Sequence, residues 1–284
     1  MMELSVDLYA IAKRFGVYKA VEMAKEAGFD AIDFSYCWEM ESEEILGDQY
    51  DAYALELRQH LDKTGIKCNQ AHAPFSIEYG CSFDLTDAKY RTIVHAIGSA
   101  AILGASNIVV HAICVPDGVD FEAYNLEFYK SLIPYCDKFG IRMAVENLFI
   151  YDWKREYFRG LFGSPDALNR IVKKLDSPWV AACVDVGHAA LTGYEPEAFL
   201  QAMDPDILAC LHIQDNDYRD DRHTIPYAGE LNWADIMAAL KKMGYQGDLT
   251  MEIFTYLNRF PDPILADALK MAASVGRYLI SLME

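Results

Sequence analysis

The sequence predicts a (β/α)8 TIM barrel, because eight short apolar runs alternate with segments of helical periodicity. Eight such units fit one domain over residues 1–284, and a hydrophobic content of 52% is enough for a large core. The alternative is an open doubly wound sheet. The number of runs and the lack of a Gly-rich phosphate loop after the first run both argue against that sheet.

The expected strands are short runs in which apolar and β-branched residues dominate. They are Leu4–Leu8, Ala31–Phe34, Ile66–Ala71, Asn107–Val110, Ile141–Val145, Trp179–Val184, Leu208–Ile213 and Leu249–Ile253.

The segments between these runs predict helices, since their apolar residues recur every three or four positions. The clearest cover residues 17–24, 50–61 and 90–101. Ser164-Pro165-Asp166 is a typical helix start, with serine as the cap and proline in the first turn. A glycine follows five of the helical segments just before the next strand, where a helix commonly ends. These glycines are Gly28, Gly65, Gly104, Gly140 and Gly244.

Composition narrows the class of protein. No unbroken apolar stretch is long enough to cross a membrane, and the N-terminus lacks the pattern of a signal peptide. The cysteine count of seven is odd, and Cys68, Cys183 and Cys210 lie in apolar runs, so we expect reduced core residues and a cytoplasmic protein. A net charge of -18 disfavours a polyanionic partner.

Six consecutive expected strands end in a histidine or an acid. Because the carboxyl ends of barrel strands meet at one mouth, these side chains should converge. Such oxygen and nitrogen donors suit Mn²⁺, Co²⁺, Mg²⁺ or Zn²⁺, and the lack of cysteine among them argues against a structural zinc site. The residues are His72, His111, Glu146, Asp185 with His188, His212 and Glu252.

Three motifs at these ends resemble the xylose isomerase-like barrel superfamily, which includes ketose 3-epimerases and endonuclease IV. They are Val184-Asp185-Val186-Gly187-His188, Leu211-His212-Ile213-Gln214-Asp215-Asn216 and Gly229-Glu230-Leu231-Asn232-Trp233. The resemblance covers nearly the whole chain. In one departure, the usual Pro-Gly pair before the third motif reads Pro226-Tyr227, which puts the shape of that loop in question.

The resemblance implies a metal-dependent isomerase or epimerase acting on a sugar, a sugar phosphate or an inosose. Its metal ligands would be Glu146, Asp185, His212 and Glu252, and His188 would contact substrate. Moving a carbonyl group passes through an enediolate, whose charge a cation stabilises. Glu146 and Glu252, three strands apart, are the candidate acid/base pair.

The endonuclease IV branch is the first alternative, since it would use up to three metals and its additional ligands are also present. They match His72, His111, His188, Asp221 and His223. Against DNA binding stand the net charge, the acidic segment Trp38–Glu44 and the absence of Lys or Arg from Ala73 to Ala88. A non-catalytic metal-binding barrel is the second alternative.

Clues to the substrate are fewer. We expect His72, His111, Arg219 and Trp38 to contact a carbohydrate, with Arg219 as a candidate anion contact. The segment Phe149–Phe162 is rich in aromatic and basic residues and is expected to be a long loop that could close over the site. Neither a membrane nor a nucleic acid is an expected partner, whereas a second copy of the chain is a candidate.

Overall fold

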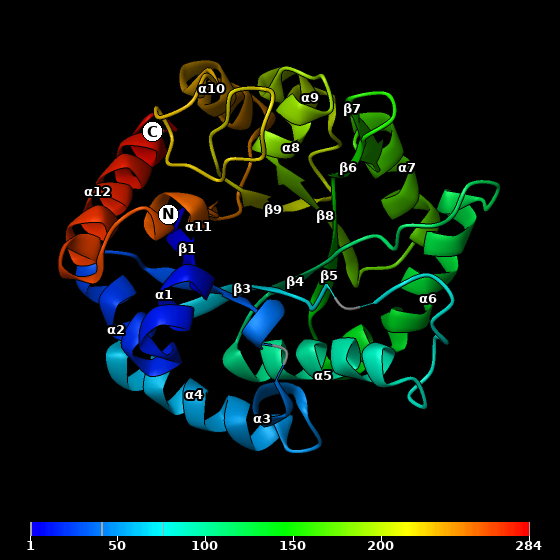
Figure 1. Cartoon of the computed structure of the whole chain (residues 1–284), viewed down its shortest axis with the longest axis horizontal. Coiled ribbons are helices and arrows are strands. Elements are labelled where there is room, and N and C mark those ends of the chain that lie inside the picture. Colours follow the sequence, from blue (N-terminus) through cyan, green and yellow to red (C-terminus); the bar gives the residue numbers. More distant parts are fainter. Residues whose placement is uncertain (1, 41, 76, 284) are drawn as a thin grey trace.

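The computed structural model describes residues 2–40, 42–75 and 77–283, and it confirms the predicted barrel. Parallel strands form the centre and helices surround them (Figure 1). The strands follow the order β10-β1-β2-β3-β4-β5-β8-β9 around the sheet. Their bounds are β1 (Leu4–Asp7), β2 (Ala31–Ser35), β3 (Lys67–His72), β4 (Asn107–Val110), β5 (Arg142–Glu146), β8 (Val180–Asp185), β9 (Leu208–His212) and β10 (Leu249–Met251).

The two ends of this sheet meet and close the barrel. The backbone N–H of Ile213 donates to the carbonyl oxygen of Thr250 at 2.8 Å, and that of Glu252 donates to the carbonyl of Ile213 at 3.0 Å. On the other side of β10, Ser5 pairs with Thr250 in the parallel register. The carboxyl ends of all eight strands therefore face one mouth.

The predicted helices are present, and their ends follow the sequence signals. Ser164 Oγ accepts a hydrogen bond from the Ala167 N–H at 3.2 Å at the start of α7. The five predicted stop glycines all adopt left-handed backbone conformations. Helix bounds are α1 (Tyr9–Phe15), α2 (Val17–Ala27), η1 (Trp38–Met40), α3 (Glu43–Leu46), α4 (Tyr50–Thr64), α5 (Ala88–Leu103), α6 (Phe121–Phe139), α7 (Pro165–Leu175), α8 (Val186–Leu191), α9 (Pro196–Ala202), α10 (Trp233–Met243), α11 (Phe254–Asn258) and α12 (Asp262–Ser281).

The segment expected to be a long loop after the fifth barrel strand is instead an antiparallel hairpin. It consists of β6 (Leu148–Asp152) and β7 (Tyr157–Leu161). At its turn, an Asp152 carboxylate oxygen accepts from the backbone N–H groups of Lys154 and Arg155. Cross-strand contact between the rings of Tyr151 and Phe158 adds to the backbone pairing.

The main hydrophobic core lies between strands and helices, whereas much of the barrel interior is polar. Ser5 and Gln70 approach Thr250 inside the barrel, and Gln70 also bonds Asp33. Although all seven cysteines are described, none forms a disulfide. Within residues 2–40, 42–75 and 77–283, every helix is too short or too polar to span a membrane.

Candidate metal centre

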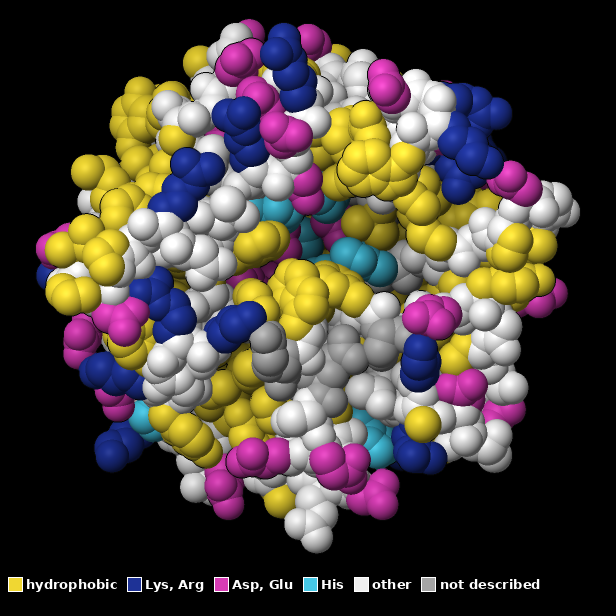
Figure 2. Space-filling model, viewed as in Figure 1, with side chains coloured by type: hydrophobic (Ala, Val, Ile, Leu, Met, Phe, Trp, Pro, Cys, Tyr) yellow, Lys and Arg dark blue, Asp and Glu magenta, His cyan; other side chains and the backbone are white. Residues whose placement is uncertain are grey.

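The barrel mouth contains a cavity of about 500 Å³. Figure 2 shows this hollow at the centre of one face, with histidine and acidic side chains inside it and hydrophobic side chains around it. Glu146, His188 and Glu252 line its floor, and Trp38 lines its wall.

Four residues from four strand ends form one compact donor group at the floor. Glu146, Asp185, His212 and Glu252 each offer one atom, and these atoms all lie within 4.8 Å of one another. His212 Nδ1 is 2.8 Å from Glu146 Oε1 and 3.5 Å from Glu252 Oε2. We call these four residues the carboxylate–histidine tetrad; three carboxylates and one imidazole are a donor set suited to a divalent cation.

The two oxygens of Asp185 have different surroundings. Asp185 ends β8 and caps α8, because its Oδ1 accepts from the His188 N–H at 2.7 Å. Its Oδ2 is buried and has no hydrogen-bond partner in the described part of the chain. A buried carboxylate oxygen without a partner is costly, so this atom fits a site that a cation completes.

The charges of the tetrad depend on one another. Burial raises the pKa of Asp185 to about 6, against the lowering effect of His188. Burial also raises the pKa of Glu146, but His212, His111 and His188 outweigh it and hold the pKa well below its usual value. For His212, burial lowers the pKa, while Glu252 and Glu146 raise it well above its usual value. Cation binding should therefore compete with a proton at His212.

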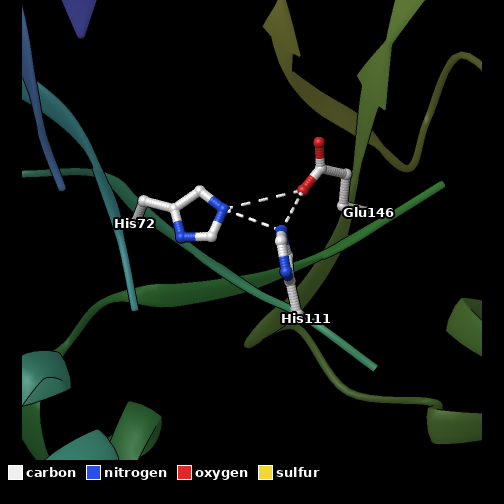
Figure 3. Close-up of side chains that lie close together, drawn as sticks. All are labelled: His72, His111 and Glu146. Carbon is white, nitrogen blue, oxygen red and sulfur yellow. Dashed lines mark hydrogen bonds and ion pairs between the residues drawn. The ribbon is translucent and has the colours of Figure 1, made fainter. Parts of the chain in front are cut away.

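A second donor group shares Glu146 with the tetrad and is drawn in Figure 3. His111 Nε2 lies 2.8 Å from Glu146 Oε2, and His72 Nε2 lies 3.6 Å from the same oxygen. The two Nε2 atoms are 3.0 Å apart. His72 comes from the end of β3 and His111 follows β4, so adjacent strand ends bring them together.

A third group consists of His188, Asp221 and His223. His223 Nε2 is 3.0 Å from Asp221 Oδ2, and His188 Nε2 is 3.8 Å from Asp221 Oδ1. Burial lowers the pKa of His223, but Asp221 and Glu252 raise it to about 9. All nine residues singled out as possible ligands in the sequence thus fall into three neighbouring groups.

Residues that the sequence reasoning missed hold the tetrad in place. Asn147 bonds the backbone of Asp185 in both directions, at 2.8 and 2.9 Å. The Gln214 amide nitrogen lies 3.3 Å from Asp185 Oδ1 and 3.0 Å from Asp221 Oδ1. Gln214 also explains Gly187, since a Cβ there would lie 2.3 Å from the Gln214 amide group. The signals in the sequence were that Asn147 follows Glu146 and that Gln214 and Gly187 lie inside two of the three motifs.

Asp33 lies next to the second ring nitrogen of His212, Nε2. Asp33 Oδ2 lies 3.6 Å from His212 Nε2 and accepts from the Gln70 amide nitrogen at 2.7 Å. Neither His212 Nε2 nor Asp33 Oδ1 has a hydrogen-bond partner in the described structure. Asp33 lay within a predicted strand, where the sequence gave no reason to separate it from the core.

The expected substrate contacts do not all reach the cavity. Trp38 and His111 line it, whereas His72 lies buried beneath and Arg219 is exposed outside the lining. Nearby, Arg222 forms an ion pair with Asp217.

In the loop with the Pro226-Tyr227 pair, the tyrosine adopts the positive-φ backbone conformation that glycine usually occupies. Tyr227 has a φ of 73°, and its N–H donates to Asp215 Oδ2 at 2.9 Å. The same carboxylate accepts from the Trp233 indole at 2.8 Å. Asp215 therefore fixes this loop beside the site.

Comparison with known proteins gives one consistent fold. A family model described as xylose isomerase-like TIM barrel matches residues 21–275. An uncharacterised protein of Methanocaldococcus jannaschii is 27% identical over 245 residues, covering 82% of this chain and 78% of its own. A 2-oxo-tetronate isomerase of Haemophilus influenzae is 28% identical over 235 residues, covering 80% and 83%.

Solved structures agree with this fold. A D-tagatose 3-epimerase-like protein superposes with a TM-score of 0.74 at 22% identity, covering 99% of this chain and 98% of that one. The IolI protein, solved with a bound zinc atom, gives a TM-score of 0.74 at 16% identity, with coverage of 99% and 98%.

Proposed function

Since the chain belongs to the xylose isomerase-like TIM barrel family, we propose that it is a divalent-metal-dependent isomerase or epimerase of a carbohydrate. The tetrad carries this proposal, because the Oδ2 atom of Asp185 is buried beside three other donors without a hydrogen bond. Similarity to a named isomerase supports the reaction class, and the zinc in the IolI structure supports a metal. Mn²⁺, Co²⁺, Mg²⁺ and Zn²⁺ all suit these donors.

In this proposal Glu146 and Glu252 transfer the proton. Both carboxylates line the cavity and come from strands three apart in the barrel order, so they approach a central substrate from different sides. One removes a proton from the carbon beside the carbonyl, and the other returns a proton to the product. A cation held by the tetrad would supply positive charge for the enediolate oxygens.

His188 is proposed to contact the substrate. It lines the cavity, and its ring is fixed by a 3.0 Å contact between Nδ1 and the Asn147 carbonyl oxygen. His188 Nε2 thereby faces the acidic floor, where it lies 3.8 Å from both Asp185 and Asp221. His111 and Trp38 remain proposed contacts because they also line the cavity.

Replacing each glutamate by its amide tests the acid/base assignment. We expect Glu146→Gln and Glu252→Gln each to lower turnover by at least about 100-fold, the usual scale for losing a general acid or base. Metal content should be measured in the same samples, so that lost chemistry is distinguished from lost metal. Full turnover by either variant would contradict the assignment.

An endonuclease IV-like activity is the second candidate, because all three donor groups are assembled. His72 and His111 form a group with Glu146, and His188 forms another with His223. The net charge of -18 is unfavourable for binding a DNA duplex. Three bound metals per chain together with nicking of an abasic-site duplex would favour this candidate. One metal and no nicking would favour the isomerase.

Three further statements about the protein stay predictions. They are a single domain over residues 1–284, a cytoplasmic location and association with a second copy. A non-catalytic metal-binding barrel is the remaining alternative; metal binding without turnover of any carbohydrate or nucleic acid would support it.

A further inference from the structure

The charged side chains that line the cavity are acids and histidines, and this property limits the substrate. All 25 Lys and Arg residues lie in the described part of the chain, and none of them lines the cavity. If the proposed function holds, the lining also limits the kind of carbohydrate. We infer that the substrate is uncharged on the part that extends from the metal centre toward the mouth, where it carries no phosphate or carboxylate.

Two arginines in the loops near the mouth form ion pairs with neighbouring aspartates. Arg155, at the tip of the hairpin, pairs with Asp152 at 2.8 Å. Arg222 pairs with Asp217 at 2.5 Å. Arg159 is exposed and lines a neighbouring depression that shares Leu161 with the cavity, but it is not among the residues that line the cavity itself. A terminal phosphate in the cavity would therefore find no guanidinium or ammonium partner in its wall.

The charged groups that do line the cavity are acids and histidines. Asp221 lines the cavity, where its Oδ1 lies 3.8 Å from His188 Nε2 and its Oδ2 lies 3.0 Å from His223 Nε2. Glu78 adds a carboxylate to the wall. An anionic group away from the metal centre would be desolvated beside these negative charges, which costs free energy.

Aromatic rings form the surface that the rest of the substrate would contact. The ring of Phe75 stacks on His111 with a centroid distance of 4.5 Å, and that of Phe254 stacks on His223 at 4.1 Å. Phe149 meets the His188 ring edge-on at 5.1 Å. Aromatic walls around a few convergent polar groups are typical of sites that bind uncharged small molecules. Such rings would pack against the C–H faces of a sugar.

Deuterium exchange tests this inference with matched pairs of probes. Metal-loaded protein in D2O is incubated with neutral ketoses of four to six carbons and with the terminal phosphate of each, and NMR follows exchange beside the carbonyl. We expect kcat/KM for exchange to be at least about tenfold higher for the neutral member of an active pair. Faster exchange of the phosphates would overturn the inference and leave the proposed function intact. No exchange with any probe by protein that holds metal would overturn both.

A substitution at the rim tests whether the lack of Lys and Arg in the lining causes the preference for neutral over phosphorylated probes. Cys114 is exposed, lines the cavity and belongs to none of the three donor groups. Cys114→Arg should reduce the preference for neutral over phosphorylated probes by at least about tenfold, whereas the uncharged control Cys114→Gln should keep it. An unchanged preference in a Cys114→Arg protein that binds metal normally would contradict the inference.

Discussion

Single side chains at the site combine a structural contact with a free donor atom. Asp185 uses Oδ1 to cap α8, which leaves Oδ2 for the centre of the tetrad. His212 directs Nδ1 at Glu146 and turns Nε2 toward Asp33. The positions of these side chains at strand ends predicted that they converge, but not these orientations, which depend on side chains from other strands.

Asp33 is expected to orient His212. A carboxylate beside Nε2 favours the tautomer that carries its proton there, and this leaves Nδ1 free to bind a cation. Asp33→Asn should therefore weaken metal binding by about tenfold or more, as changes in such supporting groups commonly do. A competition titration with a chelator would measure the dissociation constant.

A matched control for this variant is Asp248→Asn. Asp248 precedes β10 at the opposite end of the barrel, where it accepts from the Glu3 N–H and the Asn69 amide. Metal affinity should change little in this control. Equal affinity in Asp33→Asn and the unsubstituted protein would refute the orienting role.

Among the elements, the eight barrel strands were predictable and the β6–β7 hairpin was not. Barrel strands are apolar runs buried on both faces, and such runs stand out in a sequence. The hairpin mixes aromatic and basic residues and is partly exposed. Its sequence therefore lacks the clear alternation of apolar and polar residues that indicates a strand. The loop around Tyr227 was also uncertain, because a left-handed residue is usually glycine.

The backbone at Tyr227 provides a test of how that loop is held. Alanine at this position keeps the unfavourable positive φ and loses the ring contacts with Trp233 and Tyr278, whereas glycine loses the contacts but relieves the strain. Tyr227→Gly should therefore be more stable than Tyr227→Ala by about 1 kcal/mol. Urea denaturation would measure the difference, and a more stable alanine variant would contradict the left-handed conformation.

At the scale of the whole molecule, the sequence predicted which residues gather because barrel topology brings all strand ends to one mouth. What it could not predict is where loop residues lie. Arg219 is close to the third donor group in sequence, yet its side chain is exposed outside the cavity. That no Lys or Arg of the described residues lines the cavity therefore became evident only from the structure.

The polar barrel interior should make global stability depend on pH. Burial raises the pKa of Asp7 to about 7, with further contributions from Asp33 and Glu252. The folded protein therefore binds the proton of Asp7 more tightly than the unfolded chain does. The contribution of this proton to the free energy of unfolding is fully present below about pH 4. That stability is lost as pH rises through about 7.

Asp7→Asn should remove this dependence. Without metal, the free energy of unfolding of Asp7→Asn is compared with that of the unsubstituted protein. The difference in favour of the variant should rise by about 2–3 kcal/mol between pH 5 and pH 8. Urea denaturation at the two pH values would measure this change. The same relative stability at both values would show that Asp7 titrates normally.

The tetrad is expected to hold a divalent cation, and the metal content per chain measures whether it does. Elemental analysis should follow gel filtration of the Mn²⁺-loaded protein and of Asp185→Asn, in which an amide oxygen can still cap α8. We expect at least one equivalent of metal in the unsubstituted chain and a large loss in the variant. No bound metal in the unsubstituted chain, or equal metal in both proteins, would contradict the claim.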